Sequence, residues 1–132
     1  MDSLKLAEND LFRKHMDAEV LEVKNGHARV KCRIKREFLN FHGTAHGAVI
    51  MALADFAFAL AVNSDGMKRS AVSIKADFLK PVFEGDEIVG EAEITGGGKR
   101  LVFCELRVYK NGEVIAKGDA IAYGKEKWED QP

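Results

Sequence analysis

The sequence predicts an α+β fold in which one antiparallel sheet wraps around one long central helix. Three observations predict it. Residues 45–63 are almost continuously apolar, the flanking segments alternate apolar and polar residues as strands do, and short turns containing glycine separate those segments. Because no helices alternate with the strands, a doubly wound parallel sheet is excluded. With 132 residues and 46% apolar content, we expect a single domain over residues 1–132.

The first third of the chain predicts a short helix followed by a hairpin. Leucines, Phe12 and Met16 recur between charged residues over positions 3–16, which is typical of an amphipathic helix within residues 1–16, with Ser3 as a possible N-cap. Strand-like alternation follows at residues 20–23 and 28–34 on either side of Asn25-Gly26. Asn-Gly between two such runs is the strongest short signal for a hairpin.

The central helix is expected over residues 45–63. It is apolar on nearly every face, so the sheet must surround it. Its length approaches that of a membrane span, but Asp55 near its centre would cost about 2.5 to 3.5 kcal/mol in a bilayer. We therefore expect a helix in a protein core and no membrane contact.

Four further strands are predicted after the helix, at residues 70–79, 86–95, 101–109 and 114–123, as a meander. Their breaks are the segments 80–85, 96–98 and 111–112, which have the proline and glycine chemistry of turns. Residues 125–132 form a polar tail that we expect to be frayed. An exposed sheet edge would remain, and pairing it with a second copy of the chain is a simple remedy.

Composition excludes several classes of function. The chain has 20 basic and 21 acidic residues, well mixed, so no broad surface for nucleic acid is expected. Cys32 and Cys104 lie in apolar runs without metal-type spacing and are expected to be reduced core residues. The first ten residues lack the long apolar block of a signal peptide. We expect a cytoplasmic protein.

Asp55 is the first candidate for chemistry. A lone carboxylate within an apolar helix is costly unless it is paired, hydrogen-bonded or open to a pocket, and buried carboxylates are candidates for functional sites. The alternative is a core aspartate that is satisfied by backbone donors or by a partner such as Lys75 or Arg100. The residues alone leave both interpretations open.

The entrance of the helix, residues 40–47, is the second candidate. Free backbone N–H groups in a first helical turn can bind an oxyanion, and Gly47 has no side chain to block the approach. Ordinary loop and cap chemistry is the alternative. Gly47 and Asp55 are eight residues apart, about 12 Å along a helix. If both act on one carbonyl, they come from different protomers, which predicts an obligate dimer with two shared sites.

No metal site is expected. His42 and His46 have the i, i+4 spacing of helical metal ligands, but the loop composition around Gly43 makes a shared helical face doubtful. Asp55 is too far along the chain to complete a cluster with them.

The segment 40–55, NFHGTAHGAVIMALAD, resembles the signature of the PaaI-type hotdog-fold thioesterases, which include the thioesterase superfamily member 2 type. The similarity continues through residues 72–74, 80–86 and 98–103. It implies a hotdog fold and an enzyme that hydrolyses acyl-CoA thioesters to free acid and CoA. It also implies the catalytic set: Asp55 as nucleophile or general base, the Gly47 amide as oxyanion donor, and Asn40, His46 and Ser73 in supporting roles.

The same resemblance implies how the substrate binds. Lys80 and the segment of Gly98, Lys99, Arg100, Leu101 and Val102 would line a CoA groove between subunits, within a homodimer or a homotetramer of two dimers. CoA is part of the substrate, so no cofactor is expected. The family commonly has a second glycine where this chain has Ala48, a change expected to alter packing without loss of activity.

Two other functions stay open from the sequence. A hotdog dehydratase or hydratase also acts on acyl thioesters, but the Gly-His-Phe-Pro and Asp-x-x-x-x-His patterns of those enzymes are absent. A non-catalytic acyl-CoA binding module would have no need of a buried carboxylate at Asp55. The sequence does not decide between aryl and straight-chain acyl groups. The small and aromatic residues of the helix weakly favour an aryl or medium-chain acyl group.

Overall fold

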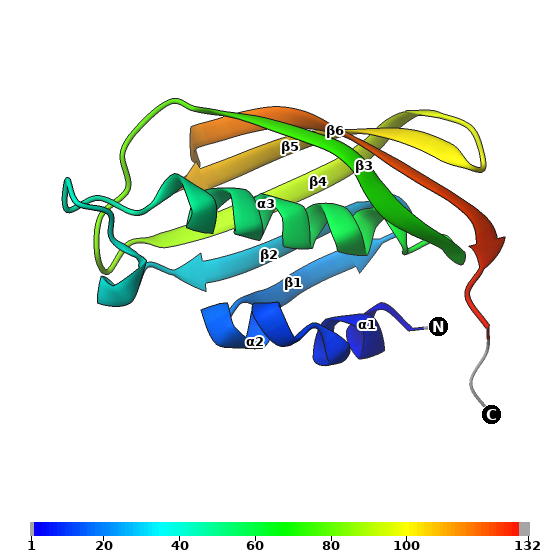
Figure 1. Cartoon of the computed structure of the whole chain (residues 1–132), viewed down its shortest axis with the longest axis horizontal. Helices are drawn as coiled ribbons and strands as arrows, with labels where there is room; N and C mark the ends of the chain where they lie inside the picture. Colours follow the sequence, from blue (N-terminus) through cyan, green and yellow to red (C-terminus); the bar gives the residue numbers. More distant parts are fainter. Residues whose placement is uncertain (1, 130–132) are drawn as a thin grey trace.

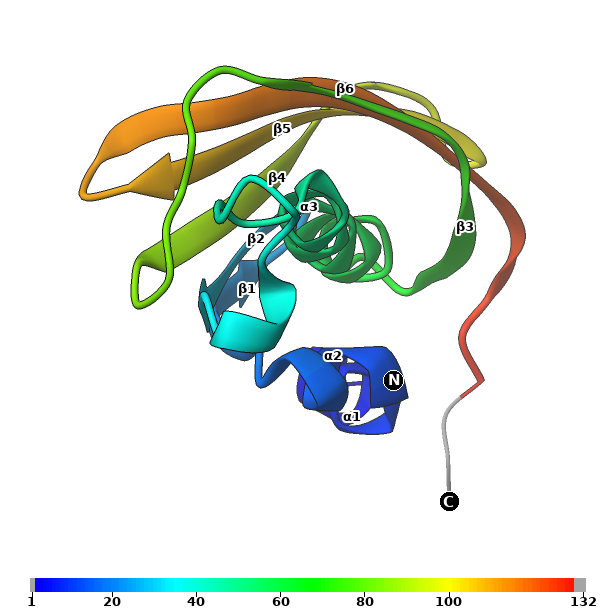
Figure 2. The same cartoon turned by 60° about the vertical axis from the view of Figure 1, so that its left-hand side comes forward.

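A computed structural model describes residues 2–129, in which a six-stranded antiparallel sheet curves around one face of a long helix, α3 (Figures 1 and 2). The strand order is β1-β2-β4-β5-β6-β3. The strands are β1 Glu19–Lys24, β2 His27–Arg33, β3 Met67–Phe78, β4 Glu87–Gly97, β5 Leu101–Lys110 and β6 Glu113–Lys127. The helices are α1 Ser3–Asn9, α2 Leu11–Met16, the 3-10 turn η1 Arg36–Phe38, and α3 Gly47–Val62. The expected hotdog architecture is confirmed.

Helix α3 lies within the segment that the sequence predicts. His46 is its N-cap, because its Nδ1 accepts a hydrogen bond from the Ala48 N–H at 3.0 Å, and Asn63 is its C-cap. The sheet approaches the helix closely at Gly90, where a Cβ atom would lie 3.1 Å from the Leu53 carbonyl oxygen. Within residues 2–129, no helix has the length and apolar character needed to span a membrane.

The expectation that every face of α3 is buried is wrong. Asp55 is exposed. Ala48, Ala52 and Ala59 lie on the same face of the helix, one or two turns before or after Asp55, and they are exposed or only half-buried. The sheet covers one side of the helix and leaves this stripe open. The small apolar side chains along it made the helix look buried all round, because a sequence pattern does not show which neighbour covers each face.

The order of the strands also differs from the predicted four-strand meander. Only β4, β5 and β6 form a meander, while β3 pairs with β6 at the far edge of the sheet, with Ile74 opposite Ala120. Residues 79–86 then cross the end of α3 to reach β4 (Figure 2). The second edge of β3 has no partner strand within the described residues.

The N-terminal segment forms two short helices instead of one. Asp10 interrupts it and accepts a hydrogen bond from the Arg13 N–H at 3.0 Å, which caps the start of α2. Asp2, and not Ser3, caps α1 by accepting from the Leu4 N–H. A carboxylate at a cap satisfies orphan N–H groups and so starts a new helix.

The predicted polar tail is partly ordered structure. Strand β6 continues to Lys127, and the Trp128 indole N–H donates to the Asn63 side-chain oxygen at 3.0 Å. Residues 130–132 lie outside the described part of the chain. Cys32 and Cys104 are buried and free as expected, and burial raises the pKa of each thiol to about 11.

Candidate active site

The loop before α3 is held in shape by Asn40. Its Oδ1 accepts hydrogen bonds from the backbone N–H groups of His42 at 2.9 Å and Thr44 at 3.2 Å, and its Nδ2 donates to the Thr44 hydroxyl at 3.1 Å. Asparagine favours such turns because its side chain substitutes for a backbone partner. In the single chain, Asn40 therefore fixes the path of the loop into the helix.

The first turn of α3 presents a free donor. The N–H of Ala48 is capped by His46, but no acceptor for the Gly47 N–H exists among residues 2–129. A helix N-terminus carries a partial positive charge, so a free N–H there attracts an oxyanion. His46 accepts through Nδ1, which requires that this nitrogen carries no proton.

Gly47 opens into a pocket of about 310 Å³, which we call the N-terminal pocket. The Phe78 ring forms one wall, since a Cβ atom on Gly47 would lie 3.4 Å from it. Lys80 lies at the rim and pairs with Glu113. The pocket is lined by Asn40, Thr44, Ala45, Gly47, Ile50, Phe78, Leu79, Lys80, Pro81 and Val82.

Asp55 lies on the open stripe of α3. No hydrogen bond or ion pair with another residue of the range 2–129 reaches its carboxylate, so the single chain does not satisfy it as a core aspartate. Lys75, one partner considered for it, pairs instead with Asp77. Partial burial, helped by the negative charge of Asp10, raises the pKa of the Asp55 carboxyl above its ordinary value. A carboxylate that is left unpaired and partly desolvated is available for chemistry.

One chain does not bring the predicted catalytic residues together. Gly47 is the first residue of α3 and Asp55 the ninth, a separation of about 12 Å along the axis. Ser73 lies exposed on β3, and no hydrogen bond joins it to Asp55 in the described chain. The structure places Asn40, His46 and Gly47 together, and Asp55 apart from them.

The residues predicted to bind CoA are also divided. Lys80 lies beside the N-terminal pocket, whereas the segment Gly98, Lys99, Arg100, Leu101 and Val102 lies at the opposite end of α3. The Lys99 carbonyl accepts a hydrogen bond at 2.6 Å from Arg69, which also binds the carbonyl of Val62 at the helix C-terminus. A helix of 16 residues is about 24 Å long. A single copy does not offer these groups as one surface.

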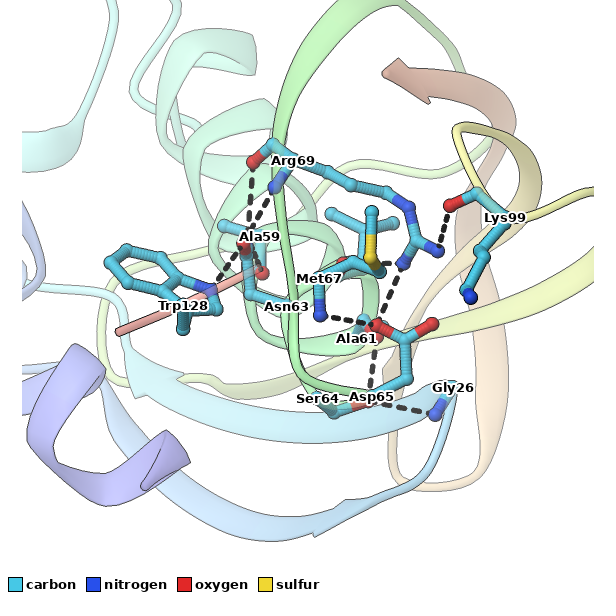
Figure 3. A network of polar contacts seen from close by, with 11 residues as sticks. Gly26, Ala59, Ala61, Asn63, Ser64, Asp65, Met67, Arg69, Lys99 and Trp128 are labelled. Carbon is cyan, nitrogen blue, oxygen red and sulfur yellow. Dashed lines mark hydrogen bonds and ion pairs between the residues drawn. The ribbon is translucent and has the colours of Figure 1, made fainter. Parts of the chain in front are cut away.

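Sequence reasoning missed Arg69 and the position of Phe78. Arg69 is buried, and its guanidinium lies among backbone carbonyls and the Asp65 carboxylate (Figure 3). The available signal was the i, i+4 spacing of Asp65 and Arg69, together with strand alternation that turns Met67 and Arg69 to the same side. Among residues 2–129, no three histidine, cysteine, aspartate or glutamate side chains lie close enough to hold a metal ion.

The fold and the site define a class. The sheet curved around a helix is the hotdog fold, and a free backbone donor at a helix start can stabilise an oxyanion. The family model described as the thioesterase superfamily matches residues 42–117, more than half of the chain. The protein belongs to the thioesterase superfamily and is a thioester hydrolase.

Individual relatives agree with this family. The chain is 39% identical over 113 residues to a protein from Archaeoglobus fulgidus, covering 83% of this chain and 73% of that one. It is 36% identical over 101 residues to the acyl-coenzyme A thioesterase PaaI of Escherichia coli, covering 76% and 72%. The solved structure of the E. coli PaaI protein matches with a TM-score of 0.91 at 27% identity, covering 95% of this chain and 91% of that chain.

Proposed function

We propose that the protein hydrolyses acyl-CoA thioesters in two sites, each shared between the protomers of a dimer. The Gly47 amide of one protomer polarises the thioester carbonyl, and Asp55 of the other attacks it or activates water. The observation that supports this most strongly is the pair of unsatisfied groups on one helix, the Gly47 N–H and the Asp55 carboxylate, about 12 Å apart. Catalytic groups must lie within about 3 Å of the reacting atoms.

The free edge of β3 supports a dimer. β3 has 12 residues, and no strand within residues 2–129 covers its outer edge. A long open edge invites pairing with another chain. Val72, Phe78 and Leu79, on or just after this strand, are half to nearly two-thirds exposed, at 63%, 51% and 50%. A partner along this edge would cover apolar surface as well as unpaired backbone groups.

The direction of β3 supports a dimer in which each site contains groups from both protomers. The strand starts at Met67 beside the C-terminus of α3 and ends at Phe78, which lies beside Gly47. Two copies paired antiparallel about a two-fold axis would bring the end of one strand beside the start of the other. The N-terminal pocket of one protomer would then face the later part of the partner's helix, which carries Asp55. Two such dimers would form the tetramer that the family resemblance implies.

The chemistry needs few groups. If Asp55 is the nucleophile, its oxygen bonds to the carbonyl carbon, the CoA thiolate leaves, and water hydrolyses the resulting anhydride. If Asp55 is a general base, it takes a proton from water, whose oxygen bonds to the carbon as the thiolate leaves. A thiol has a pKa of about 8.5, so the leaving group needs no strong acid. Both routes give the free acid and CoA.

The CoA part of the proposal is supported by the E. coli relative, whose name states an acyl-coenzyme A thioesterase. Cations on both sides of the proposed shared site fit a substrate with phosphates: Lys80 at the rim of the N-terminal pocket, and Lys99 and Arg100 in the β4–β5 hairpin. Arginine and lysine are the side chains that bind phosphate most strongly.

The test is thiol release from a panel of aryl and straight-chain acyl-CoAs by the native protein and Asp55→Asn. We expect turnover of at least one thioester and a loss of about a hundredfold or more in Asp55→Asn, as for removal of a catalytic acid or base. Asp119→Asn, an exposed carboxylate on the outer face of β6, is the matched control and should keep native activity. Binding without thiol release would favour the binding module, and conversion of enoyl or 3-hydroxyacyl thioesters would favour a hydratase or dehydratase.

The same assay gives a pH profile. Both mechanisms require Asp55 as the ionised carboxylate, and its pKa is raised by partial burial and by Asp10. Activity should therefore be complete above this raised pKa and be lost as the pH falls through it. A profile whose acidic limb lies at the pKa of an ordinary aspartate, about 3.9, would contradict the raised value.

A further inference from the structure

The β4–β5 hairpin is held from two sides, although its sequence, Gly96-Gly97-Gly98-Lys99-Arg100, indicates a flexible turn. The Gly98 N–H donates to the Leu101 carbonyl at 2.7 Å, which closes the turn. From β6, the Gly124 N–H donates to the Arg100 carbonyl at 2.9 Å. From β3, the Arg69 guanidinium donates to the Lys99 carbonyl at 2.6 Å. We call residues 97–101 the glycine hairpin.

Arg69 connects this hairpin to the end of α3. One nitrogen, Nη1, donates to the Val62 carbonyl and to Asp65 Oδ1, both at 2.9 Å, while Nη2 reaches Lys99 (Figure 3). Only 1% of the Arg69 side chain is exposed. A planar guanidinium with donors in a fixed fork sets the relative positions of the groups it binds, which a lysine ammonium does not.

Burying the Arg69 guanidinium costs free energy, and its contribution to packing does not account for its presence. Its Nε has no hydrogen-bond partner among the described residues. A buried ion pair is often no more stable than well-packed apolar side chains of the same volume. The fixed position of the hairpin relative to α3 is therefore what the guanidinium adds.

The side chains that the hairpin displays are cations. Lys99 and Arg100 are exposed, and neither forms an ion pair within residues 2–129. Their carbonyls are the two groups that Arg69 and Gly124 hold, so the backbone below both side chains is fixed. A phosphate-binding pair gains affinity when its geometry is set in advance, because less conformational entropy is lost on binding.

We propose that Arg69 is a positioning residue for the phosphate-bearing part of the substrate, acting through the Lys99 carbonyl on the cations of the glycine hairpin. This rests on the proposed function, since it assigns the nucleotide end of CoA to this hairpin. Arg69 itself touches no substrate. Its effect should appear in the affinity for CoA and be absent from the chemical step.

The test compares two ligands that share the thiol end but differ in phosphates. CoA and pantetheine are titrated into the native protein and Arg69→Lys by calorimetry, after circular dichroism has shown that the variant is folded. We expect Arg69→Lys to weaken CoA binding about tenfold, as for one weakened charge-assisted hydrogen bond, and to leave pantetheine binding unchanged. With an acyl-CoA that is turned over, KM should rise and kcat should stay within about twofold.

A second pair of variants changes the hairpin without altering Arg69. Gly97 has φ +105°, and a Cβ there would lie 2.3 Å from the Leu101 carbonyl oxygen, so Gly97→Ala must distort the turn. Gly96→Ala is the matched control, because the nearest atom to its Cβ would be 3.9 Å away, on Phe103. Gly97→Ala should weaken CoA binding selectively, and Gly96→Ala should not.

The outcomes separate this inference from the proposed function. Equal loss of affinity for CoA and pantetheine in Arg69→Lys, or no loss for either, would overturn the positioning role, as would a native protein that does not bind CoA. A native protein that binds CoA with the expected dependence on Arg69 but releases no thiol would sink the hydrolase proposal and leave this inference standing.

Discussion

The two ends of α3 differ in how their backbone groups are satisfied. At the N-terminal end, the Gly47 N–H points to no acceptor among residues 2–129, and a pocket lies in front of it. At the C-terminal end, the carbonyls of Ala59, Ala61 and Val62 accept from Asn63, Ser64 and Arg69 side chains (Figure 3). Free groups at a helix end are costly when buried, so most proteins satisfy them.

The contrast indicates different roles for the two ends. The C-terminal end joins the β1–β2 hairpin, β3, the glycine hairpin and Trp128 in one hydrogen-bonded network, in which Asn63 alone makes four bonds. Such a network indicates a structural role, in which this end of the helix fixes the positions of the elements around it. The N-terminal end is open and holds its loop in place through Asn40, which is the pattern of a site prepared for a ligand.

The largest expected effect comes from removing the free donor. Gly47→Pro removes the backbone N–H and adds a pyrrolidine ring, and proline is well accepted at the first position of a helix. His46 before it has φ −62° and ψ 137°, a conformation that a following proline allows. We expect a loss of about 10² to 10³ in kcat, as for an oxyanion donor, measured as thiol release with folding checked by circular dichroism.

Gly47→Ala is the matched control for this change. It adds a Cβ at 3.4 Å from the Phe78 ring but keeps the N–H. It should therefore retain far more activity than Gly47→Pro. Equal activity of the two variants would mean that the Gly47 N–H does not contact the reacting carbonyl.

A smaller effect, on stability, is expected at the other end of the helix. Asn63→Ala removes two donated and two accepted hydrogen bonds, and should lower the free energy of unfolding by about 3 kcal/mol. Ser64→Ala removes two bonds and should cost about half as much. Urea unfolding gives both values. A large loss of kcat in folded Asn63→Ala, with stability unchanged, would reverse the roles assigned to the two ends.

How far the sequence predicts the molecule depends on whether the signal is local. The Asn25-Gly26 hairpin is confirmed, and α3, Gly47–Val62, lies within the predicted segment 45–63, because turn chemistry and apolar runs are properties of neighbouring residues. The partner of β3 was wrong, since alternation identifies a strand but not the strand it pairs with. Trp128 was assigned to a frayed tail because its neighbours are polar, and its bond to Asn63 joins residues 65 positions apart.

The candidate site shows the same limit. Asn40, Thr44 and Gly47 line one pocket, because all three lie at the start of one helix. Asp55 was expected to be buried and is exposed, since the sequence reveals that the helix is apolar but not which stripe the sheet leaves open. Arg69 was missed because a charge in a strand usually faces solvent. Ser73, Asp55 and the groove over Lys80 and the glycine hairpin stay predictions about an assembly of two chains.

Mixed dimers test the shared site most directly. Asp55→Asn and Gly47→Pro protomers, carrying different tags, are co-expressed, and dimers with one of each are purified and assayed for thiol release. If Gly47 and Asp55 act from different protomers, each mixed dimer has one intact site and should show about half of the native activity, while both parent dimers are nearly inactive. Mixed dimers as inactive as the parents would mean that the two residues act within one chain, and would contradict the account.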